Sequence, residues 1–323
     1  MKTLLVGYKA ADLSRELLEG DVTCHVLDVY HRHAIEKVWH AKAICSPHLP
    51  EGPWDLIRFK TGPKLMSGEL TLDLFQEIRA QVGGDLKAAR GRWTLDYVGR
   101  ERDRNELLDK VCKDVRRVRD FSSTWTASVP GGPKLPFTSF PGCFCHRRLD
   151  EGGLALAEVV ARDLASADVR LPTPAGSAPT LLDMGCGCGL VGLLVADAYR
   201  RLRPSETLGL VLVDSHSRAV EAATLNARAQ ESPAEVILAD GGTPARMDGT
   251  FDLFVGNPPY YSDYRIADVF LETAKRALRP DGVCYTVCKN AAGLKPVQER
   301  HFPHVEVIPR RGYAVLKSVR NRE

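Results

Sequence analysis

The chain has 323 residues, of which 44% are hydrophobic and 26% are charged, so a wholly disordered protein is excluded and two domains are expected. The longest apolar runs, such as Gly189–Ala196, are far shorter than the roughly 20 residues of a membrane span. Nine cysteines without an export signal favour reduced thiols over a disulfide framework, and they predict a cytoplasmic protein with no membrane association.

The first 120 residues alternate short apolar segments with amphipathic ones. The predicted strands cover residues 3–7, 22–29, 54–59 and 93–98, and the predicted helices cover residues 11–18, 70–82 and 105–118. Strands and helices that take turns in this way predict a mostly parallel sheet covered by helices. The turn after the first strand, Gly7-Tyr8-Lys9-Ala10, is not a glycine-rich nucleotide loop, so this half is predicted to be a scaffold or a recognition domain.

Positive charge is concentrated in this first half. Residues 1–150 hold 24 Lys and Arg against 20 Asp and Glu, whereas residues 151–323 hold 20 against 21. The run Lys87–Arg119 alone carries 11 basic and 6 acidic residues. Charge alone favours a solvated helix face here, because both signs are mixed. The alternative is a patch that faces nucleic-acid phosphates.

A break in the pattern separates the two halves. Residues 122–141 are rich in Ser, Thr, Gly and Pro, and neither the helical nor the strand period continues there. We therefore place the junction in this stretch, with one domain at residues 1–136 and a second at residues 137–323.

The most informative run of the chain is an apolar strand, a glycine turn and an apolar helix. The strand contains Asp183 near its end, and Gly185, Gly187 and Gly189 follow at alternate positions. Glycines let a backbone approach a ligand closely, and the helix start offers N–H groups. The spacing differs from the dinucleotide pattern, and an acid at the strand end would oppose a pyrophosphate. Asp183 instead suits a ligand with cationic groups, such as the amino group of a methionine moiety.

Two further predicted strands end in aspartate. Asp214 follows residues 208–213, where a carboxylate can accept both hydroxyls of a ribose. Asp240 follows residues 237–239 and could reach an adenine amino group. Any one of these acids could be a cap or turn residue, which is the commoner use of aspartate. Three of them in order after a glycine turn favour a ligand site at the edge of an open α/β sheet.

The apolar strand 251–256 is followed by Asn257-Pro258-Pro259-Tyr260. Two prolines alone would simply end the strand. In the full motif, the Asn257 amide oxygen and the Pro258 carbonyl can both accept hydrogen bonds from a planar NH₂ group. The two prolines fix the backbone, and the Tyr260 ring offers a stacking face. Such a turn holds an exocyclic amine and directs its nitrogen at an electrophile.

These motifs resemble those of class I S-adenosylmethionine-dependent methyltransferases that act on amino nitrogens. Asn-Pro-Pro-Tyr is shared by adenine-N6, guanine-N2 and protein-glutamine enzymes. The segments Phe140–Phe144, Leu149–Gly152 and Arg311–Lys317 resemble the ribosomal RNA guanine-N2 methyltransferases of the RsmC and RlmG kind. The resemblance is strong over residues 137–318 and only architectural before them.

The resemblance implies an α/β fold of two tandem Rossmann-like methyltransferase domains, of which the first is degenerate and the second catalytic. It implies S-adenosylmethionine as the cofactor, and ribosomal RNA or a ribosomal subunit as the partner of a monomer without metal. The first domain would serve as a platform for RNA, on which Arg116, Arg117 and Arg119 contact the phosphate backbone of the RNA. The residues expected in catalysis are Asn257, Pro258, Pro259 and Tyr260. The residues expected to bind the cofactor are Asp150, Asp183, Gly185, Gly187, Gly189, Asp214, Asp240 and Asn257.

The sequence departs from the family at two positions. The family often has arginine where His146 stands, which leaves a cofactor role for His146 open. It often has asparagine near Lys289, which leaves open whether Lys289 or Asn290 lines the base pocket.

Three other functions compete with this interpretation. A protein-glutamine methyltransferase would share the second half, but we would expect a small helical first domain. An adenine-N6 DNA enzyme would need a target-recognition domain, and none is evident. A non-catalytic protein on a decayed fold would have lost the Asp or Asn positions, and they are present.

Several cysteines invite a metal interpretation. Cys143-x-Cys145-His146 and Cys186-x-Cys188 have spacings that chelate one tetrahedral ion poorly, so no metal site is predicted. Cys284 and Cys288 fall in an apolar strand and are interpreted as small core residues.

Overall fold

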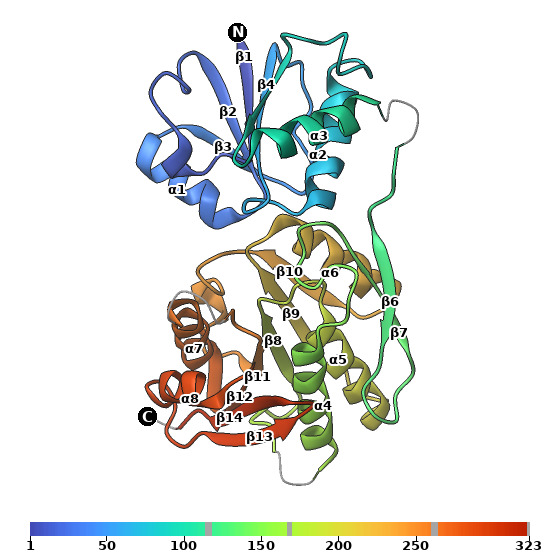
Figure 1. Cartoon of the computed structure of the whole chain (residues 1–323). Helices are drawn as coiled ribbons and strands as arrows, with labels where there is room; N and C mark the ends of the chain where they lie inside the picture. The colour runs from blue at the N-terminus through green and yellow to red at the C-terminus, as the bar shows by residue number, and fades with distance from the viewer. Residues whose placement is uncertain (114–117, 167–169, 260–263, 322–323) are drawn as a thin grey trace. The chain divides into compact units, whose positions relative to one another are not determined.

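The computed structural model describes residues 1–113, 118–166, 170–259 and 264–321. It divides the chain into two compact units, each an α/β fold with its own main sheet (Figure 1). The first unit comprises Met1–Ser122, Phe140–Cys143 and His216–Arg218. The second comprises Ser123–Ser139, Phe144–Ser215 and Ala219–Glu323.

The first unit is built on a five-stranded sheet of order β3-β2-β1-β4-β5, in which every neighbouring pair is parallel. This confirms the predicted parallel sheet. Its strands are β1 (Lys2–Val6), β2 (Asp21–Val26), β3 (Lys42–Cys45), β4 (Leu56–Thr61) and β5 (Trp93–Tyr97). Its helices are α1 (Val29–Trp39), α2 (Gly68–Gln81) and α3 (Glu101–Lys113), with a short 3₁₀ turn, η1 (Ala10–Asp12).

Helix α2 shows why the first unit folds around its sheet. Ser67 caps the helix by accepting a hydrogen bond from the Leu70 N–H at 3.2 Å. Apolar residues three and four apart then face the sheet, and Leu74 and Phe75 are almost fully buried. The Phe75 ring meets that of Phe59 edge-on, with centroids 5.0 Å apart.

Three of the elements in this unit differ from the expectation. Residues 11–18 do not form a helix beyond η1, and the Ser14 hydroxyl accepts a hydrogen bond from the Leu17 N–H in the turn that follows. A serine hydroxyl that bonds nearby backbone competes with helix formation. Helix α1 and strand β3 were not predicted; only Val29 and Ile35 are buried in α1, so its apolar period is weak.

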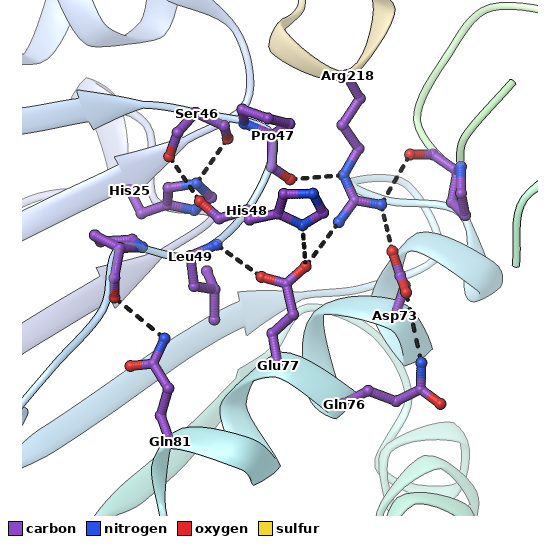
Figure 2. A network of polar contacts seen from close by, with 12 residues as sticks. His25, Ser46, Pro47, His48, Leu49, Asp73, Gln76, Glu77, Gln81 and Arg218 are labelled. Carbon is purple, nitrogen blue, oxygen red and sulfur yellow. Dashed lines mark hydrogen bonds and ion pairs between the residues drawn. The ribbon is translucent and has the colours of Figure 1, made fainter. Parts of the chain in front are cut away.

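A network of polar contacts within the first unit surrounds the buried Arg218, which is 1% exposed (Figure 2). Its guanidinium donates to Asp73 Oδ2 at 2.5 Å and to Glu77 Oε1 at 3.3 Å. The other Glu77 oxygen accepts from the Leu49 N–H at 2.7 Å, which fastens the segment after β3 to α2. Beside it, burial lowers the pKa of His25 to about 4, and its ring bonds the Ser46 carbonyl. The two carboxylates balance the charge of the buried Arg218 guanidinium, so the network stabilises the fold of this unit.

The second unit is built on a seven-stranded sheet of order β10-β9-β8-β11-β12-β14-β13. The first five strands are parallel, and β14 and β13 run antiparallel to their neighbours. Its strands are β8 (Thr180–Met184), β9 (Gly209–Asp214), β10 (Ala234–Leu238), β11 (Phe251–Gly256), β12 (Leu278–Cys288), β13 (Glu306–Arg310) and β14 (Tyr313–Val319).

Helices cover both faces of this sheet, with α4 and α5 on one side and α7 and α8 on the other (Figure 1). The helices are α4 (Glu151–Ala165), α5 (Leu190–Leu202), α6 (Ser217–Ala229), α7 (Arg265–Ala277) and α8 (Ala291–Glu299), with a 3₁₀ turn, η2 (Ala245–Met247). Strand β11 is buried along its whole length, as expected for a central parallel strand. Among the described residues, no helix has the length and apolar content that a membrane crossing requires.

The stretch 122–141, where no strand was predicted, contains a two-stranded hairpin. Strands β6 (Ser123–Ala127) and β7 (Leu135–Ser139) pair antiparallel, with Trp125 stacked on Phe137 at 5.2 Å. Asn226 also bonds the Thr138 backbone in both directions, at 2.8 Å each. The alternation of Thr with Trp favours a strand, but the connecting Pro and Gly residues conceal it. The hairpin belongs to the second unit, so the main run of the first unit ends at Ser122 rather than at residue 136.

Candidate functional site

The turn between β8 and α5 contains three glycines with a left-handed backbone. Gly185, Gly187 and Gly189 all have positive φ, at 69°, 55° and 84°. A Cβ on Gly185 would lie 2.7 Å from the Phe270 ring, so no larger residue fits there. A Cβ on Gly187 would meet nothing within 4 Å, so this glycine is needed for its left-handed backbone rather than for close packing.

The three aspartates lie at the carboxyl ends of the adjacent parallel strands: Asp183 within β8, Asp214 as the last residue of β9, and Asp240 just after β10. They therefore lie along one edge of the sheet. Asp214 Oδ2 accepts a hydrogen bond from the Gly187 N–H at 2.9 Å and so fixes the glycine turn. Asp240 comes two residues after β10, and the Ala239 N–H before it donates to the Asp214 carbonyl at 3.0 Å. The structure therefore joins the predicted loop to the predicted acids.

Asp183 is the most deeply buried of these acids, at 2% exposed. Its Oδ2 accepts from the Gly192 N–H in the first turn of α5 at 2.8 Å. Burial raises the pKa of Asp183 to about 7; the Gly192 N–H opposes that shift, and the carboxylates of Asp214 and Asp150 add to it. In the described part of the chain, no Lys or Arg pairs with Asp183. This buried carboxylate therefore has no positive side chain beside it among the residues that the structure describes.

Asp150 and Asn257 meet although 107 residues separate them. Asp150 caps α4, and its Oδ1 accepts from the Gly152 N–H at 3.1 Å. Its Oδ2 accepts from Asn257 Nδ2 at 2.9 Å, directly after β11 ends at Gly256. The amide group of Asn257 is thus held in one orientation, with the buried Pro258 next in the chain. Tyr260 lies outside the described residues, so its expected stacking role stays a prediction.

The sequence left open whether Lys289 or Asn290, both beyond β11, lines the base pocket. Lys289 follows β12, and its Nζ lies 4.1 Å from the centroid of the Tyr313 ring at the start of β14. Asn290 caps α8, because its Oδ1 accepts from the Ala292 N–H at 3.0 Å. The antiparallel return of β14 brings Tyr313 to this edge. Only the resemblance of residues 311–317 pointed to that strand.

The cysteine motifs are arranged as structural groups. Cys186 and Cys188 are buried, and burial raises the pKa of the Cys186 thiol, with Asp214 and Asp183 adding to the shift. His146 lies in a different setting, with Nδ1 at 3.0 Å from the Ser139 hydroxyl. Across the ranges that the structure describes, no group of three or more His, Cys, Asp or Glu side chains is placed to hold a metal ion.

The predicted basic run is only partly described. Two ion pairs lie at the start of helix α3: Arg100, the residue before the helix, pairs with Asp103 at 3.0 Å, and Arg102 pairs with Glu106 at 2.8 Å. Arg119 is exposed, and its backbone N–H donates to Gln76 at 2.6 Å. Arg116 and Arg117 lie outside the described residues.

Comparison with known proteins gives one family. The model of the methyltransferase small domain matches residues 134–317. Ribosomal RNA small subunit methyltransferase C of Stutzerimonas stutzeri is 30% identical over 350 residues, which cover 99% of this chain and 95% of that protein. The enzyme of the same name from Pseudoalteromonas translucida is 29% identical over 195 residues, 59% of this chain and 51% of the relative.

A solved structure shows the same fold over the whole chain. It is a T. thermophilus 16S rRNA N2 G1207 methyltransferase in complex with AdoMet and guanosine, with a TM-score of 0.74 and 19% identity. The match covers 100% of this chain and 88% of that one, so the predicted two-domain methyltransferase architecture is confirmed. The chain therefore belongs to the methyltransferase small domain family, as a member of the ribosomal RNA small subunit methyltransferase C group.

Proposed function

We propose that this chain transfers a methyl group from S-adenosylmethionine to the exocyclic N2 amine of a guanine in ribosomal RNA. The observation that carries the proposal is the Asn257 amide, held by Asp150 at 2.9 Å, next to a strand edge with three carboxylates. The printed names of the relatives agree with it, since they describe ribosomal RNA methyltransferases and one complex with AdoMet and guanosine.

S-adenosylmethionine fits the acidic end of the site. It carries a sulfonium and an ammonium group, and Asp183 is a buried carboxylate without a Lys or Arg partner among the described residues. A cation nearby would favour the charged form of Asp183. The open space beside Gly187 leaves room for the ligand against the turn. We assign the ribose hydroxyls to Asp214 and the adenine amino group to Asp240, as acceptors at the ends of β9 and β10.

The reaction depends mainly on the alignment of the target nitrogen with the methyl group of the cofactor. The bound cofactor supplies an electrophilic methyl group, and the chain places the target nitrogen in line with it. Asn257 Nδ2 donates to Asp150, which leaves the amide oxygen available as an acceptor beside the Pro258 carbonyl of the next residue in our assignment. Those two oxygens accept hydrogen bonds from the guanine N2 amine and stabilise the positive charge that forms on it. The target base must be unpaired or turned out of a helix to reach them.

The first unit favours an RNA target over a protein glutamine. A glutamine methyltransferase would be expected to have a small helical first domain, whereas β3-β2-β1-β4-β5 is a full parallel sheet with helices. We propose that this unit is a platform for the RNA backbone, through the run Lys87–Arg119. Backbone contacts release counterions, so RNA affinity is expected to fall steeply with salt while cofactor affinity is not.

One labelling experiment tests the proposed function. The full chain is incubated with methyl-labelled S-adenosylmethionine and, in separate reactions, protein-depleted rRNA, assembled ribosomal subunits or a release factor. Label recovered as N2-methylguanosine supports the proposal. Label in N6-methyladenosine or in protein contradicts it and identifies another member of the Asn-Pro-Pro-Tyr group.

We also propose that the enzyme acts as a monomer in the cytoplasm. Nine cysteines without a disulfide among the described residues suit a reducing compartment. Light scattering of the purified chain tests the first part of this proposal, and a mass of two chains would overturn it.

A further inference from the structure

The carboxyl edge of the second sheet has two chemically different halves. The acidic half lies at the carboxyl ends of β8, β9 and β10 and carries Asp183, Asp214 and Asp240. The substrate half lies at the ends of β11 and β12 and at the start of β14. It carries Asn257, Lys289 and Tyr313. A lysine among the acids would repel a cationic cofactor. Its position beyond Asn257, on the far side of β11, places it with the substrate.

Lys289 and Asn257 are brought to the same edge by strand register. Gly256 of β11 pairs with Thr286 of β12, so Asn257 and Lys289 both leave the sheet within three residues of that pair. Cys288 of β12 pairs with Ala314 of β14, which sets Lys289 beside Tyr313. The Lys289 ammonium lies 4.1 Å from the Tyr313 ring, and no carboxylate pairs with it in the described part of the chain.

Tyr313 connects this cation to the amide. Its ring lies so close to Gly152 that a Cβ there would be 3.1 Å from Cε1. The Gly152 N–H donates to Asp150, and Asp150 accepts from Asn257. The Tyr313 ring, the start of α4 and the Asn257 amide are therefore successive contacts in one packed group.

The turn that carries Tyr313 is fixed as well. Arg311 and Gly312 both have positive φ, at 51° and 72°, and close the β13–β14 hairpin. Arg311 pairs with Glu151 at 2.8 Å and with the buried Glu158 at 3.3 Å. These pairs tie the hairpin to the first turns of α4, so Tyr313 and the cation beside it are held in place rather than left to move freely.

We propose that Lys289 donates a hydrogen bond to O6 of the target guanine and so determines which base is methylated. The inference rests on the proposed function and names the group that reads the base. Asn290, the other candidate, already uses its Oδ1 to cap α8. The Tyr313 face holds the ammonium without consuming its three N–H donors in an ion pair.

The chemistry of the two purines explains the selection. In guanine the amine is on C2, and O6 lies on the other side of N1. In adenine the amine is on C6, so when that amine occupies the Asn257 position, C2–H takes the place of O6. A C–H group accepts no hydrogen bond, and the Lys289 donor is left unpaired near a desolvated base. A lysine at this position therefore rejects adenine by the loss of a charged hydrogen bond.

The test is a cycle that changes the donor and the acceptor separately. The donor change is Lys289→Met, and the acceptor change is 6-thioguanine in place of the target guanine, which keeps the N2 amine and N1–H. Each change alone should lower kcat/KM by about 10- to 100-fold, the range for one hydrogen bond to a charged group. Together they should lower it no further than either alone, because each removes the same bond.

Controls separate this role from others. Lys295→Met is the matched variant, since Lys295 pairs with Glu299 on the surface of α8 at 3.5 Å, and it should leave the rate unchanged. Cofactor affinity and the unfolding midpoint should be equal in both variants and the parent. Multiplicative losses in the cycle, or an equal loss on every RNA with a flatter salt dependence, would mean a phosphate contact and overturn the inference. If the parent enzyme makes no N2-methylguanosine, the proposed function itself fails.

Discussion

The two sheets of this chain end their leading strands in the same turn but use it differently. Gly7 after β1 and Gly185 after β8 both have positive φ, at 78° and 69°. Each donates its N–H to the neighbouring strand, Gly7 to His25 at 3.2 Å and Gly185 to Val213 at 2.8 Å. The backbone of a ligand-binding turn is therefore present twice, and the side chains around it decide whether it can hold a ligand.

Strand register shows which side chains differ. Val6 pairs with His25 and Met184 pairs with Val213, so Leu5 stands at the position of Asp183 and Val26 at that of Asp214. Both apolar residues are buried, at 0% and 4% exposed. The acids that suit a cationic ligand in the second unit are replaced by core residues in the first.

The glycine at the strand end is tightly packed in both units. A Cβ on Gly7 would lie 2.5 Å from the Met66 side chain and 2.6 Å from the Lys60 carbonyl, and a Cβ on Gly185 would lie 2.7 Å from the Phe270 ring. Open space appears only two residues later in the second unit, where a Cβ on Gly187 would meet nothing within 4 Å. Lys60 stands at the position of Asn257, because Val6 pairs with Phe59 and Met184 pairs with Gly256. Its ammonium pairs with Asp12 at 2.6 Å. At the position that corresponds to Asn257, the first unit therefore has a lysine in an ion pair, whereas the second unit has an amide that is hydrogen-bonded to Asp150.

The largest expected effect comes from the amide at the end of β11. Asn257→Ala should lower turnover by about 10²–10³, because one acceptor of the developing positive charge is lost. Cofactor affinity should change little. The same substitution at the equivalent position of the first unit, Lys60→Ala, should leave turnover near that of the parent. Steady-state kinetics with rRNA measures both, and an active Asn257→Ala enzyme would contradict the assigned role.

A smaller effect is expected at the end of β9. Asp214→Ala should weaken S-adenosylmethionine binding by about 1.5–3 kcal/mol, since it removes an acceptor and releases the Gly187 N–H. Titration calorimetry should also give one site per chain, because Val26 stands where the first unit would need its acid. Two sites per chain, or unchanged affinity in the variant, would contradict the assignment of cofactor binding to the second unit and to Asp214.

A methyl group on either glycine turn should destabilise the fold, but only the one in the second unit should weaken cofactor binding. Gly7→Ala should lower the free energy of unfolding by about 1–3 kcal/mol, because its Cβ meets the Lys60 backbone, and it should spare cofactor affinity. Gly187→Ala should cost about 1–2 kcal/mol of backbone strain and weaken cofactor binding as well. Thermal unfolding and cofactor titration of both variants measure this. Equal losses of affinity would show that both turns face a ligand.

The smallest expected effect depends on pH. The folded-state pKa of Asp183 is raised from 3.8 to about 7, so its contribution to stability falls as the pH rises from about 4 to 7 and is lowest above 7. Asp183→Asn keeps an acceptor for Gly192 and removes this cost. Without cofactor it should unfold at a higher temperature than the parent at pH 8, by about 2–4 °C for each kcal/mol recovered, and similarly to it near pH 4.

The same substitution should remove a pH dependence of binding. In the parent, affinity for S-adenosylmethionine should fall as the pH drops through 7 and Asp183 takes up a proton. Asp183→Asn should bind more weakly, with a flat profile over that range. Parallel profiles would mean that another group is responsible.

The parts of the site that the sequence predicts are those set by a single strand and its end. Asp183, Asp214 and Asp240 could be placed together because parallel neighbouring strands end at one edge. Asp150 could not be placed by any such rule, since its partner Asn257 lies 107 residues further on, and only the family resemblance indicated it. Lys289 and Tyr313 are brought together by the antiparallel pairing of β12 with β14, which no local sequence pattern predicts.

The same limit explains the fold. Helix α2 was predicted because its apolar residues recur on one face, and β11 because its apolar run is continuous. The β6–β7 hairpin was missed because its stability comes from Trp125 stacking on Phe137 and from Asn226, which is far away in the chain. Residues 11–18 have a helical composition, but the Ser14 hydroxyl directs a local turn.

The buried thiol of Cys186 has a chemical consequence of its own. A sulfonium methyl donor is an alkylating agent, and a thiolate is a better nucleophile toward it than a neutral amine. Cys186 is 6% exposed, and burial together with the charges of Asp214 and Asp183 keeps its sulfur protonated. The carboxylates of Asp214 and Asp183 thus also lower the nucleophilic reactivity of the Cys186 sulfur. A cysteine can therefore stand in this turn without being alkylated in place of the substrate.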